Sequence, residues 1–297
     1  MHKKIFMLAT IFIWAIFFSE ANAEGIWRLD ASNAYKLPVN FRADDDLHIS
    51  GSGQPSIAGM AMLHDELCKK IAGAGKIYLV DLRQESHGYF LPADLEGYPV
   101  SYYTEKNLAN FFRGNDEVED IEIELLTDML GAEVNLLPLG NFDKKYLRPV
   151  SCPVDGVRTE RDLATDWGFE YVRFPVTDMY FPAPDVVDAF IQFVANLNEN
   201  DWVHFHCQGG LGRTTTFMAM YEILKNPDKS LGEICQHQAD LGGTYLLERK
   251  VGDPKDYYIQ AHDLRAENLI EFFFYVRGVQ REEIGLQWSE YILKRNH

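Results

Sequence analysis

The chain of 297 residues is 46% hydrophobic and 13% aromatic, which supplies a folded core and excludes a disordered protein. Its formal net charge of −17 argues against nucleic acid or an anionic bilayer as the main partner, because both are anionic themselves. A phosphorylated small substrate stays compatible with this charge, since a local basic pocket can exist on an acidic surface.

Residues 1–23 have the pattern of a signal peptide. Lys3 and Lys4 precede an apolar run, and Ala21-Asn22-Ala23 gives the small-x-small pattern of a cleavage site. We therefore expect an exported protein, periplasmic or secreted, whose mature chain begins near Glu24 and keeps no stable membrane anchor. The alternative is an uncleaved anchor, although the apolar run is at the short end for spanning a bilayer.

The first half of the mature chain is irregular in pattern. A polar lead covers residues 24–53, and Ser56 is expected to cap a helix that ends before Gly73. The apolar run IYLVDL at 77–82 predicts a buried strand. Residues 88–157 mix an acidic helical stretch at 117–130 with short β-like segments at 98–103, 134–139 and 145–151. We interpret residues 88–157 as a β-rich elaboration of the fold.

Helices and strands alternate more regularly after residue 158. The apolar spacing predicts strands at 171–176 and 202–206 and helices at 159–166, 185–197, 212–224, 230–240 and 257–276. Alternation of this kind predicts an α/β fold with a mainly parallel central sheet and helices on both faces.

The stretch HFHCQGGLGRTTT at 204–216 joins the last of these strands to a helix. Backbone N–H groups at such a helix N-terminus form a site for anions. Gly209, Gly210 and Gly212 permit close backbone approach, and the Arg213 guanidinium can bind two phosphoryl oxygens at once. Cys207, placed at the helix start and facing Arg213, should favour the thiolate, which is a nucleophile for phosphorus. The alternative is a buried inert cysteine beside a surface arginine.

The segment HCQGGLGRT resembles the Cys-x5-Arg signature of protein tyrosine phosphatases. Further segments make the chain similar to one branch of them, the bacterial cysteine phytases, which act on inositol hexakisphosphate. These segments are WRLD at 27–30, NFR at 40–42, DLRQESHGY at 81–89, GYPVSYY at 97–103, TDMYFPAP at 177–184, LKNPDKSL at 224–231 and GG at 242–243. The resemblance implies a single tyrosine-phosphatase-like domain over residues 24–297.

The resemblance also implies roles for site residues in phosphomonoester hydrolysis. Cys207 attacks phosphorus and becomes a cysteinyl-phosphate, and Arg213 stabilises the equatorial oxygens together with the amides of the loop residues Gln208, Gly209, Gly210, Leu211 and Gly212. Asp178 is the expected general acid, although a plain turn aspartate is the alternative. Thr214 stabilises the thiolate, and His206 orders the loop with its side chain directed away from the substrate. The resemblance implies neither a metal nor an organic cofactor.

Substrate-binding residues are less sharply marked. Arg42 is expected near the pocket mouth, and Arg249, Lys250 and Lys255 follow the GG pair as further cations, while a solvated surface arginine is the alternative for Arg42. Within DLRQESHGY, Arg83 and His87 equally suit a structural network behind the loop. Because the sequence offers few such cations, it does not decide whether the substrate is an inositol polyphosphate or a phosphoprotein. The rival functions are a phosphotyrosine or phosphoinositide phosphatase and, from another class, an inactive phosphate-binding module.

Three cysteines remain besides Cys207, namely Cys68, Cys152 and Cys235. Export would permit a disulfide between two of them. The sequence does not decide whether such a pair forms.

Overall fold

Two β-sheets organise the part of the chain that the computed structural model describes, which is residues 25–31, 35–71, 73–93, 97–111, 113–138 and 148–295. The expected signal peptide at 1–23 and the expected mature start at Glu24 lie outside these residues. Among the described helices, none is both long enough and apolar enough to cross a bilayer.

The central sheet has five strands, and its order across the sheet is β10-β4-β11-β3-β2. Their bounds are β10 (Glu170–Val176), β4 (Ile77–Arg83), β11 (Trp202–His206), β3 (Ile49–Ser52) and β2 (Arg42–Asp44). Neighbouring strands are parallel except at the edge, where β2 runs antiparallel to β3. The predicted mainly parallel sheet is therefore confirmed, and its carboxyl edge collects the ends of β4, β10 and β11.

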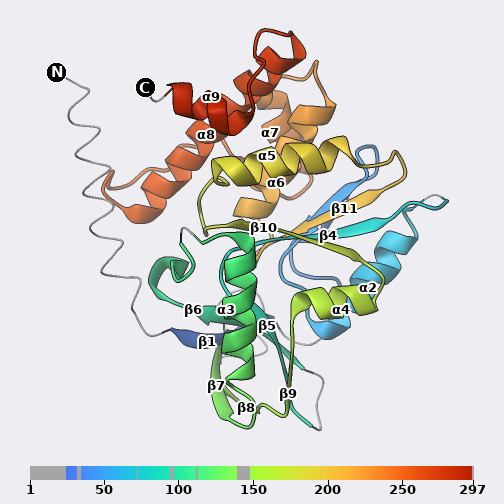
Figure 1. Ribbon diagram of the computed structural model, residues 1–297, viewed down its shortest axis with the longest axis vertical. Coiled ribbons are helices and arrows are strands. Elements are labelled where there is room, and N and C mark those ends of the chain that lie inside the picture. Colours follow the sequence, from blue (N-terminus) through green and yellow to red (C-terminus); the bar gives the residue numbers. More distant parts are fainter. Residues whose placement is uncertain are drawn as a thin grey trace.

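Helices cover both faces of the central sheet (Figure 1). On one face, α2 (Ile57–Cys68) and α4 (Glu160–Asp166) pack their apolar side chains against Ile77, Leu79 and Trp202. On the other face, the core joins Val80, Leu82 and Phe205 to a larger group of helices. These are α5 (Pro184–Ala195), α6 (Gly212–Lys225), α7 (Leu231–Asp240), α8 (Tyr257–Gln280) and α9 (Trp288–Arg295). Because side chains alternate along a strand, β4 contributes side chains to the hydrophobic cores on both faces of the sheet.

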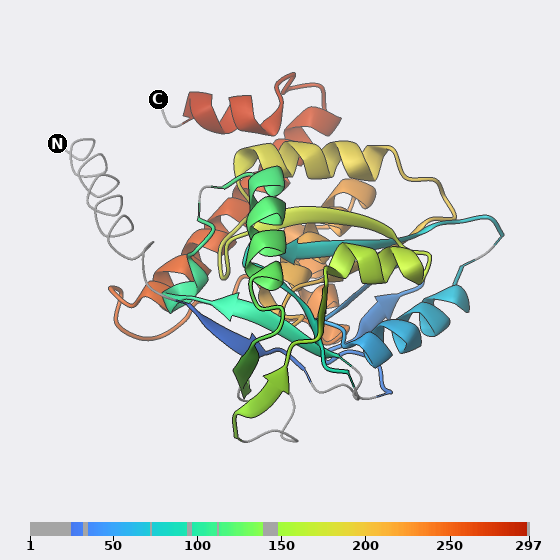
Figure 2. The same cartoon turned by 60° about the horizontal axis from the view of Figure 1, so that its bottom comes forward.

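A second sheet lies below the central one in Figure 1 and comes forward in Figure 2. Its six strands run in the order β8-β7-β1-β6-β5-β9. Their bounds are β8 (Val150–Pro153), β7 (Glu133–Pro138), β1 (Ile26–Leu29), β6 (Tyr98–Tyr103), β5 (His87–Leu91) and β9 (Gly156–Arg158). Helix α3 (Asn115–Thr127) contacts strands of both sheets, β5 and β10 among them, and so joins the two layers.

The polar lead at 24–53, in which the sequence predicts no strand, contains β1, β2 and β3. The sequence pattern does not reveal these strands, for physical reasons. β3 reads ISGS, and after Ile49 its buried residues are small, so it lacks the apolar run that predicts a buried strand. In β1 only Trp27 and Leu29 face the core, and this strand pairs with β6 and β7, far along the chain.

Candidate active site

A loop from Cys207 to Leu211 leaves β11 at the carboxyl edge of the central sheet, and α6 begins immediately after it at Gly212. We call residues 207–213 the catalytic loop. The first turns of α6 are buried, including Arg213 and Thr214. This arrangement gives the strand, loop and helix expected from the sequence, with the helix N-terminus at the base of the site.

The N-terminal part of the chain holds the backbone of the catalytic loop from behind. Three successive loop carbonyls accept hydrogen bonds from it: Gln208 O from Gln54 N at 3.1 Å, Gly209 O from Asn40 Nδ2 at 2.9 Å and Gly210 O from Arg42 Nη1 at 2.7 Å. Because a peptide's C=O and N–H point in opposite directions, fixing the carbonyls on this side orients amide groups toward the other. The loop is thus built as an anion site by residues outside it.

The placement of Arg42 corrects the expectation that it lies at the pocket mouth. Its side chain is buried, and its Nη2 also donates to Thr215 Oγ1 at 3.0 Å. The reason is topological, because β2 pairs with β3 so that Arg42 lies opposite Gly51, directly beneath the loop. Burial lowers the pKa of Arg42 to about 10, which the nearby Cys207 partly offsets. Arg42 therefore supports the loop and does not open toward the mouth.

Two loop glycines are required by close contacts. Gly210 has a φ of +73°, and a Cβ on it would lie 2.3 Å from the backbone N of Gly53. A Cβ on Gly212 would lie 2.6 Å from Nη1 of Arg265. A side chain at Gly210 would displace the loop from the backbone of Gly53, whereas one at Gly212 would displace the guanidinium of Arg265.

Cys207 is buried within this loop, and its sulfur accepts two hydrogen bonds. One comes from Gly210 N at 3.3 Å and the other from Thr214 Oγ1 at 3.2 Å. Donors aimed at a sulfur stabilise negative charge on it. The structure therefore brings Thr214 to the thiol, as the sequence predicts.

Arg213 is held by Glu85, which sequence reasoning missed. Nη1 and Nη2 of Arg213 donate to the two carboxylate oxygens of Glu85 at 2.6 and 2.9 Å, and Nη1 also donates to Val176 O at 3.1 Å. Burial alone would raise the pKa of Glu85, but Arg213 and Arg83 hold it well below its usual range. Glu85 follows β4 directly, and its position at that strand end was the signal that could have found it.

Asp178 approaches the same arginine from the segment that follows β10. Its Oδ1 lies 3.2 Å from Arg213 Nη2, and its side chain is 38% exposed. Just before it, the Thr177 hydroxyl donates to Gln84, and just after it Met179 takes a left-handed φ of 71°. A buried anchor on one side and a rare backbone conformation on the other fix where this carboxylate enters the site.

Arg265 of α8 is a second functional residue that the sequence reading missed. Only 3% of it is exposed, and among the described residues its Nε and Nη1 have no hydrogen-bond partner. Burial lowers its pKa, while Asp178 and Cys207 act in the opposite direction. The available signal was a polar residue inside an apolar helical stripe, since Arg265 lies between the buried Ala261 and Leu269.

The predicted cations after residue 243 lie at the surface. Arg249 is 62% exposed and lies 3.3 Å from Asp263, and Lys250 is 44% exposed with its Nζ 2.5 Å from Glu248. Lys255 is exposed as well. In this structure they do not converge with Arg42, because Arg42 is buried behind the loop.

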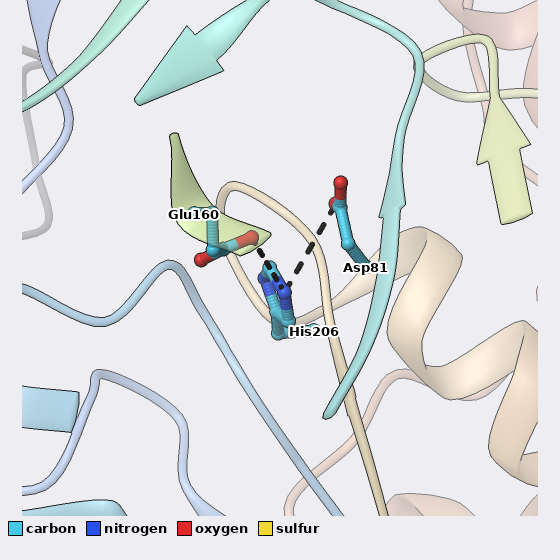
Figure 3. A group of neighbouring side chains, drawn as sticks. All are labelled: Asp81, Glu160 and His206. Atoms are coloured by element: carbon cyan, nitrogen blue, oxygen red, sulfur yellow. Dashed lines mark ion pairs between the residues drawn. The ribbon is translucent and has the colours of Figure 1, made fainter. Parts of the chain in front are cut away.

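His206 belongs to a buried group with Glu160 and Asp81, whose carboxylates both face its ring (Figure 3). Its Nε2 is 3.1 Å from Glu160 and 4.0 Å from Asp81, and the ligand atoms of these three residues lie close enough together to hold a metal ion. Protein cations already face both carboxylates. Arg173 Nε is 3.0 Å from Asp81, and His87 Nε2 is 3.2 Å from Glu160. The group therefore behaves as a charge network behind the loop.

The remaining thiols are free. Cys152 and Cys235 are buried, Cys68 is exposed, and none of the three forms a disulfide within the described chain.

Residues 80–225 match a family model of protein-tyrosine-phosphatase-like phytases whose description names inositol hexakisphosphate. A solved structure of a phytase of this type from Bdellovibrio bacteriovorus is 32% identical, with a TM-score of 0.71, and the match covers 91% of this chain and 95% of that one. The tandemly repeated phytase of Mitsuokella multacida is 31% identical with a TM-score of 0.81, covering 92% of this chain and 50% of that one.

Two further similar proteins are a phosphatase solved with a bound inositol phosphate and a bacterial effector protein. A protein-tyrosine-phosphatase-like myo-inositol phosphatase from Mitsuokella multacida, solved in complex with myo-inositol-(1,3,4,5)-tetrakisphosphate, is 30% identical with a TM-score of 0.81, covering 92% of this chain and 50% of that one. The effector protein hopD2 of Pseudomonas syringae pv. tomato is 28% identical over 248 residues, which are 78% of this chain and 52% of that protein. The chain thus spans about half the length of the Mitsuokella and Pseudomonas proteins.

Proposed function

The chain belongs to the family of protein-tyrosine-phosphatase-like phytases, and we propose that it is a cysteine-dependent phosphatase of myo-inositol polyphosphates, with inositol hexakisphosphate as a substrate. The observation that carries this proposal is the convergence of Cys207, Arg213 and Asp178 on one anion site. Asp178 comes from a separate segment, yet its carboxylate lies 3.2 Å from the loop arginine. Binding alone would require neither the thiol nor the acid.

The proposed chemistry proceeds in two steps. The Cys207 thiolate attacks phosphorus and forms an S–P bond as the bond to the leaving oxygen breaks, and Asp178 donates the proton that this oxygen takes. Water then attacks phosphorus, Asp178 accepts its proton, and the thiolate leaves with the hydrogen bond from Thr214 Oγ1 that it has in this structure. Arg213 and the loop amides stabilise the charge on the equatorial oxygens in both steps.

The substrate class is supported by the cations at the site and by one relative. Arg213 and Arg265 are both buried beside the loop, and Arg265 has donors left for an anion. The Mitsuokella relative binds an inositol tetrakisphosphate. A substrate with several phosphates supplies anions for more than one such cation at the same time.

Phosphate release by the purified, reduced protein tests the proposal. Inositol hexakisphosphate, a phosphotyrosine peptide and a phosphoinositide are compared at equal concentration, and we expect the highest kcat/KM on the first. Faster release from either of the others would reassign the substrate. Release from none of them, by protein with a cooperative melting transition, would favour a phosphate-binding module.

We also propose that the protein is exported, which rests on the pattern of residues 1–23. N-terminal sequencing of the protein recovered from the cell envelope or medium should find a chain that begins near Glu24. A chain that retains residues 1–23 would indicate an uncleaved anchor instead.

A further inference from the structure

The buried side chain of Gln84 joins the segment that carries Asp178 to the rest of the domain. We call residues 177–183 the acid segment. The amide oxygen of Gln84 accepts a hydrogen bond from the Thr177 hydroxyl, and its amide nitrogen donates to Arg113 O at 3.3 Å. The backbone carbonyl of Gln84 accepts from Asn110 Nδ2 at 2.8 Å. Because Gln84, Thr177 and Asn110 are all buried, water competes little with these hydrogen bonds.

Residues 177–180 form a closed turn around the proposed acid. Tyr180 N donates to Thr177 O at 3.1 Å, and Met179 N donates to Oδ1 of Asp178 at 3.0 Å. Together with the φ of 71° at Met179, these hydrogen bonds give the turn a fixed internal shape. Since Thr177 begins the turn, the hydrogen bond of its hydroxyl sets the direction in which the Asp178 carboxylate points.

A cavity of about 560 Å³ adjoins the acid segment. Gln84, Thr177 and Tyr180 line it, and Asn115 and Asp185 at the starts of α3 and α5 line it as well. A cavity provides no van der Waals contacts, so packing does not hold the acid segment on this side. The position of the turn therefore depends strongly on directional contacts such as the buried hydrogen bond between Thr177 and Gln84.

We propose that Gln84 is a positioning residue for the general acid, which it orients through Thr177, an inference that rests on the proposed function. The next residue along the chain has the corresponding role for the arginine, since Glu85 orients Arg213. Two consecutive residues after β4 thus position the two charged groups that act on the phosphate. Loss of Gln84 disturbs proton transfer to the leaving oxygen, while the pair of Glu85 and Arg213 stays in place.

A displaced acid has a kinetic signature, because protonation matters most for a poor leaving group. The oxygen of p-nitrophenyl phosphate leaves as an anion that the nitro group stabilises, whereas the oxygen of phenyl phosphate depends more on a proton from Asp178. The quantity to compare is kcat/KM, because it reports the step in which the S–P bond forms and the bond to the leaving oxygen breaks.

The test measures kcat/KM of Gln84→Met and Thr177→Val on phenyl phosphate and p-nitrophenyl phosphate. Each variant should lower the value about 10- to 100-fold for phenyl phosphate and less than about threefold for p-nitrophenyl phosphate. Thr177→Ser keeps the hydroxyl and should restore most of the loss. The ratio of the two values comes from one preparation, so partial unfolding cancels from it.

Two further variants separate positioning from a general effect on the fold. Gln238→Met is the matched control, because Gln238 is also buried and its amide donates to Glu222 at 2.8 Å, and the ratio should stay at the wild-type value. The double variant Gln84→Met/Thr177→Val should lose about as much as the more impaired single variant, because both changes remove one hydrogen bond.

Asp178→Asn is the reference for a missing acid and should show the same selective loss more strongly. If Asp178→Asn shows this loss but Gln84→Met and Thr177→Val slow both substrates equally or not at all, this inference is overturned and the proposed function stands. Additive losses in the double variant would overturn it too. An unchanged ratio in Asp178→Asn, or a wild-type enzyme that hydrolyses neither substrate, would refute the proposed function itself and the positioning role with it.

Discussion

The two sides of the catalytic loop differ in how buried charge is balanced. Behind the loop, Arg83 lies between Asp30 at 2.7 Å and Glu85 at 2.8 Å, and Arg173 lies 3.0 Å from both Asp81 and Glu122. On the open side, Arg265 is as deeply buried, and two of its nitrogens have no hydrogen-bond partner within the described chain. Arg83 Nη2 also lacks such a partner, so the difference lies in the ion pairs: Arg83 lies between two carboxylates, whereas no carboxylate of the described residues lies within ion-pair distance of Arg265.

This difference distinguishes residues that hold the loop in place from residues that bind the anion. A network of paired buried charges holds its members in one geometry, and removing one member leaves the others unpaired. An unpaired buried cation lowers stability by itself, so its presence beside an anion site indicates a role in binding. The comparison therefore predicts opposite responses to mutation on the two sides.

The largest effect is expected from the nucleophile, which lies between the two sides. Cys207→Ser should lower kcat by at least about 10⁴-fold while the folded protein still binds inositol hexakisphosphate, because the anion site remains. Phosphate release and calorimetric titration measure the two properties. Cys68→Ser is the matched control, since Cys68 is exposed on α2 and should be dispensable. Turnover near the wild-type rate in Cys207→Ser would reject the mechanism.

Behind the loop, Glu85→Gln should be strongly destabilising. It leaves Arg213 and Arg83 without a shared carboxylate, which we expect to lower the free energy of unfolding by about 3–5 kcal/mol. Denaturant unfolding measures the change, and kcat should fall with it because Arg213 loses its orientation. The exposed Glu248→Gln, which breaks only the pair with Lys250, should leave the free energy of unfolding nearly unchanged. Similar losses of unfolding free energy in the two variants would contradict a structural role for the charge network behind the loop.

On the open side, Arg265→Met should weaken anion binding without lowering stability. Loss of charge-assisted hydrogen bonds, about 1.5–3 kcal/mol, corresponds to a roughly 10- to 100-fold higher inhibition constant for inorganic phosphate. Without phosphate, the variant should unfold at the same denaturant concentration as the wild type or a higher one. Destabilisation as large as that of Glu85→Gln would show that Arg265 belongs to the structural network after all.

The smallest expected effect is a pH dependence of stability that comes from His87, behind the loop. Burial tends to lower the pKa of His87, but Asp81, Glu122 and Glu160 outweigh it and raise the pKa to about 8 from 6.5. A raised pKa in the folded state means that this stabilisation is complete below pH 6.5 and is lost as pH rises through 8. We expect a loss of about 2 kcal/mol in unfolding free energy over that window. His87→Gln should flatten the profile, and an unchanged profile would argue against a charged His87.

Local pattern explains what the sequence could predict. Cys207, Arg213 and Thr214 are contiguous with a strand and a helix, so their proximity follows from one turn of chain. The strands β4, β10 and β11 and the helices α2, α4, α5, α6, α7 and α8 have clear apolar patterns and lie close to their expected bounds. Glu85 and Arg265 each have a local signal, a strand end and a polar position within an apolar helical stripe, but neither signal shows that the residue lies against the loop. Strand order brings the end of β4 to the loop, and helix packing brings α8 against Gly212.

The three carbonyl contacts behind the loop set a lower limit on the size of an active enzyme. The region that matches the family, residues 80–225, contains the proposed nucleophile Cys207, the proposed acid Asp178, Glu85 and Arg213. A fragment with these limits would nevertheless lack Asn40, Arg42 and Gln54, which orient the loop peptides, and Arg265, which lies against it. Every group that takes part in bond making would be present, but the amides would no longer be directed at phosphorus. The smallest catalytic unit is therefore the surrounding domain and not the segment that carries the signature.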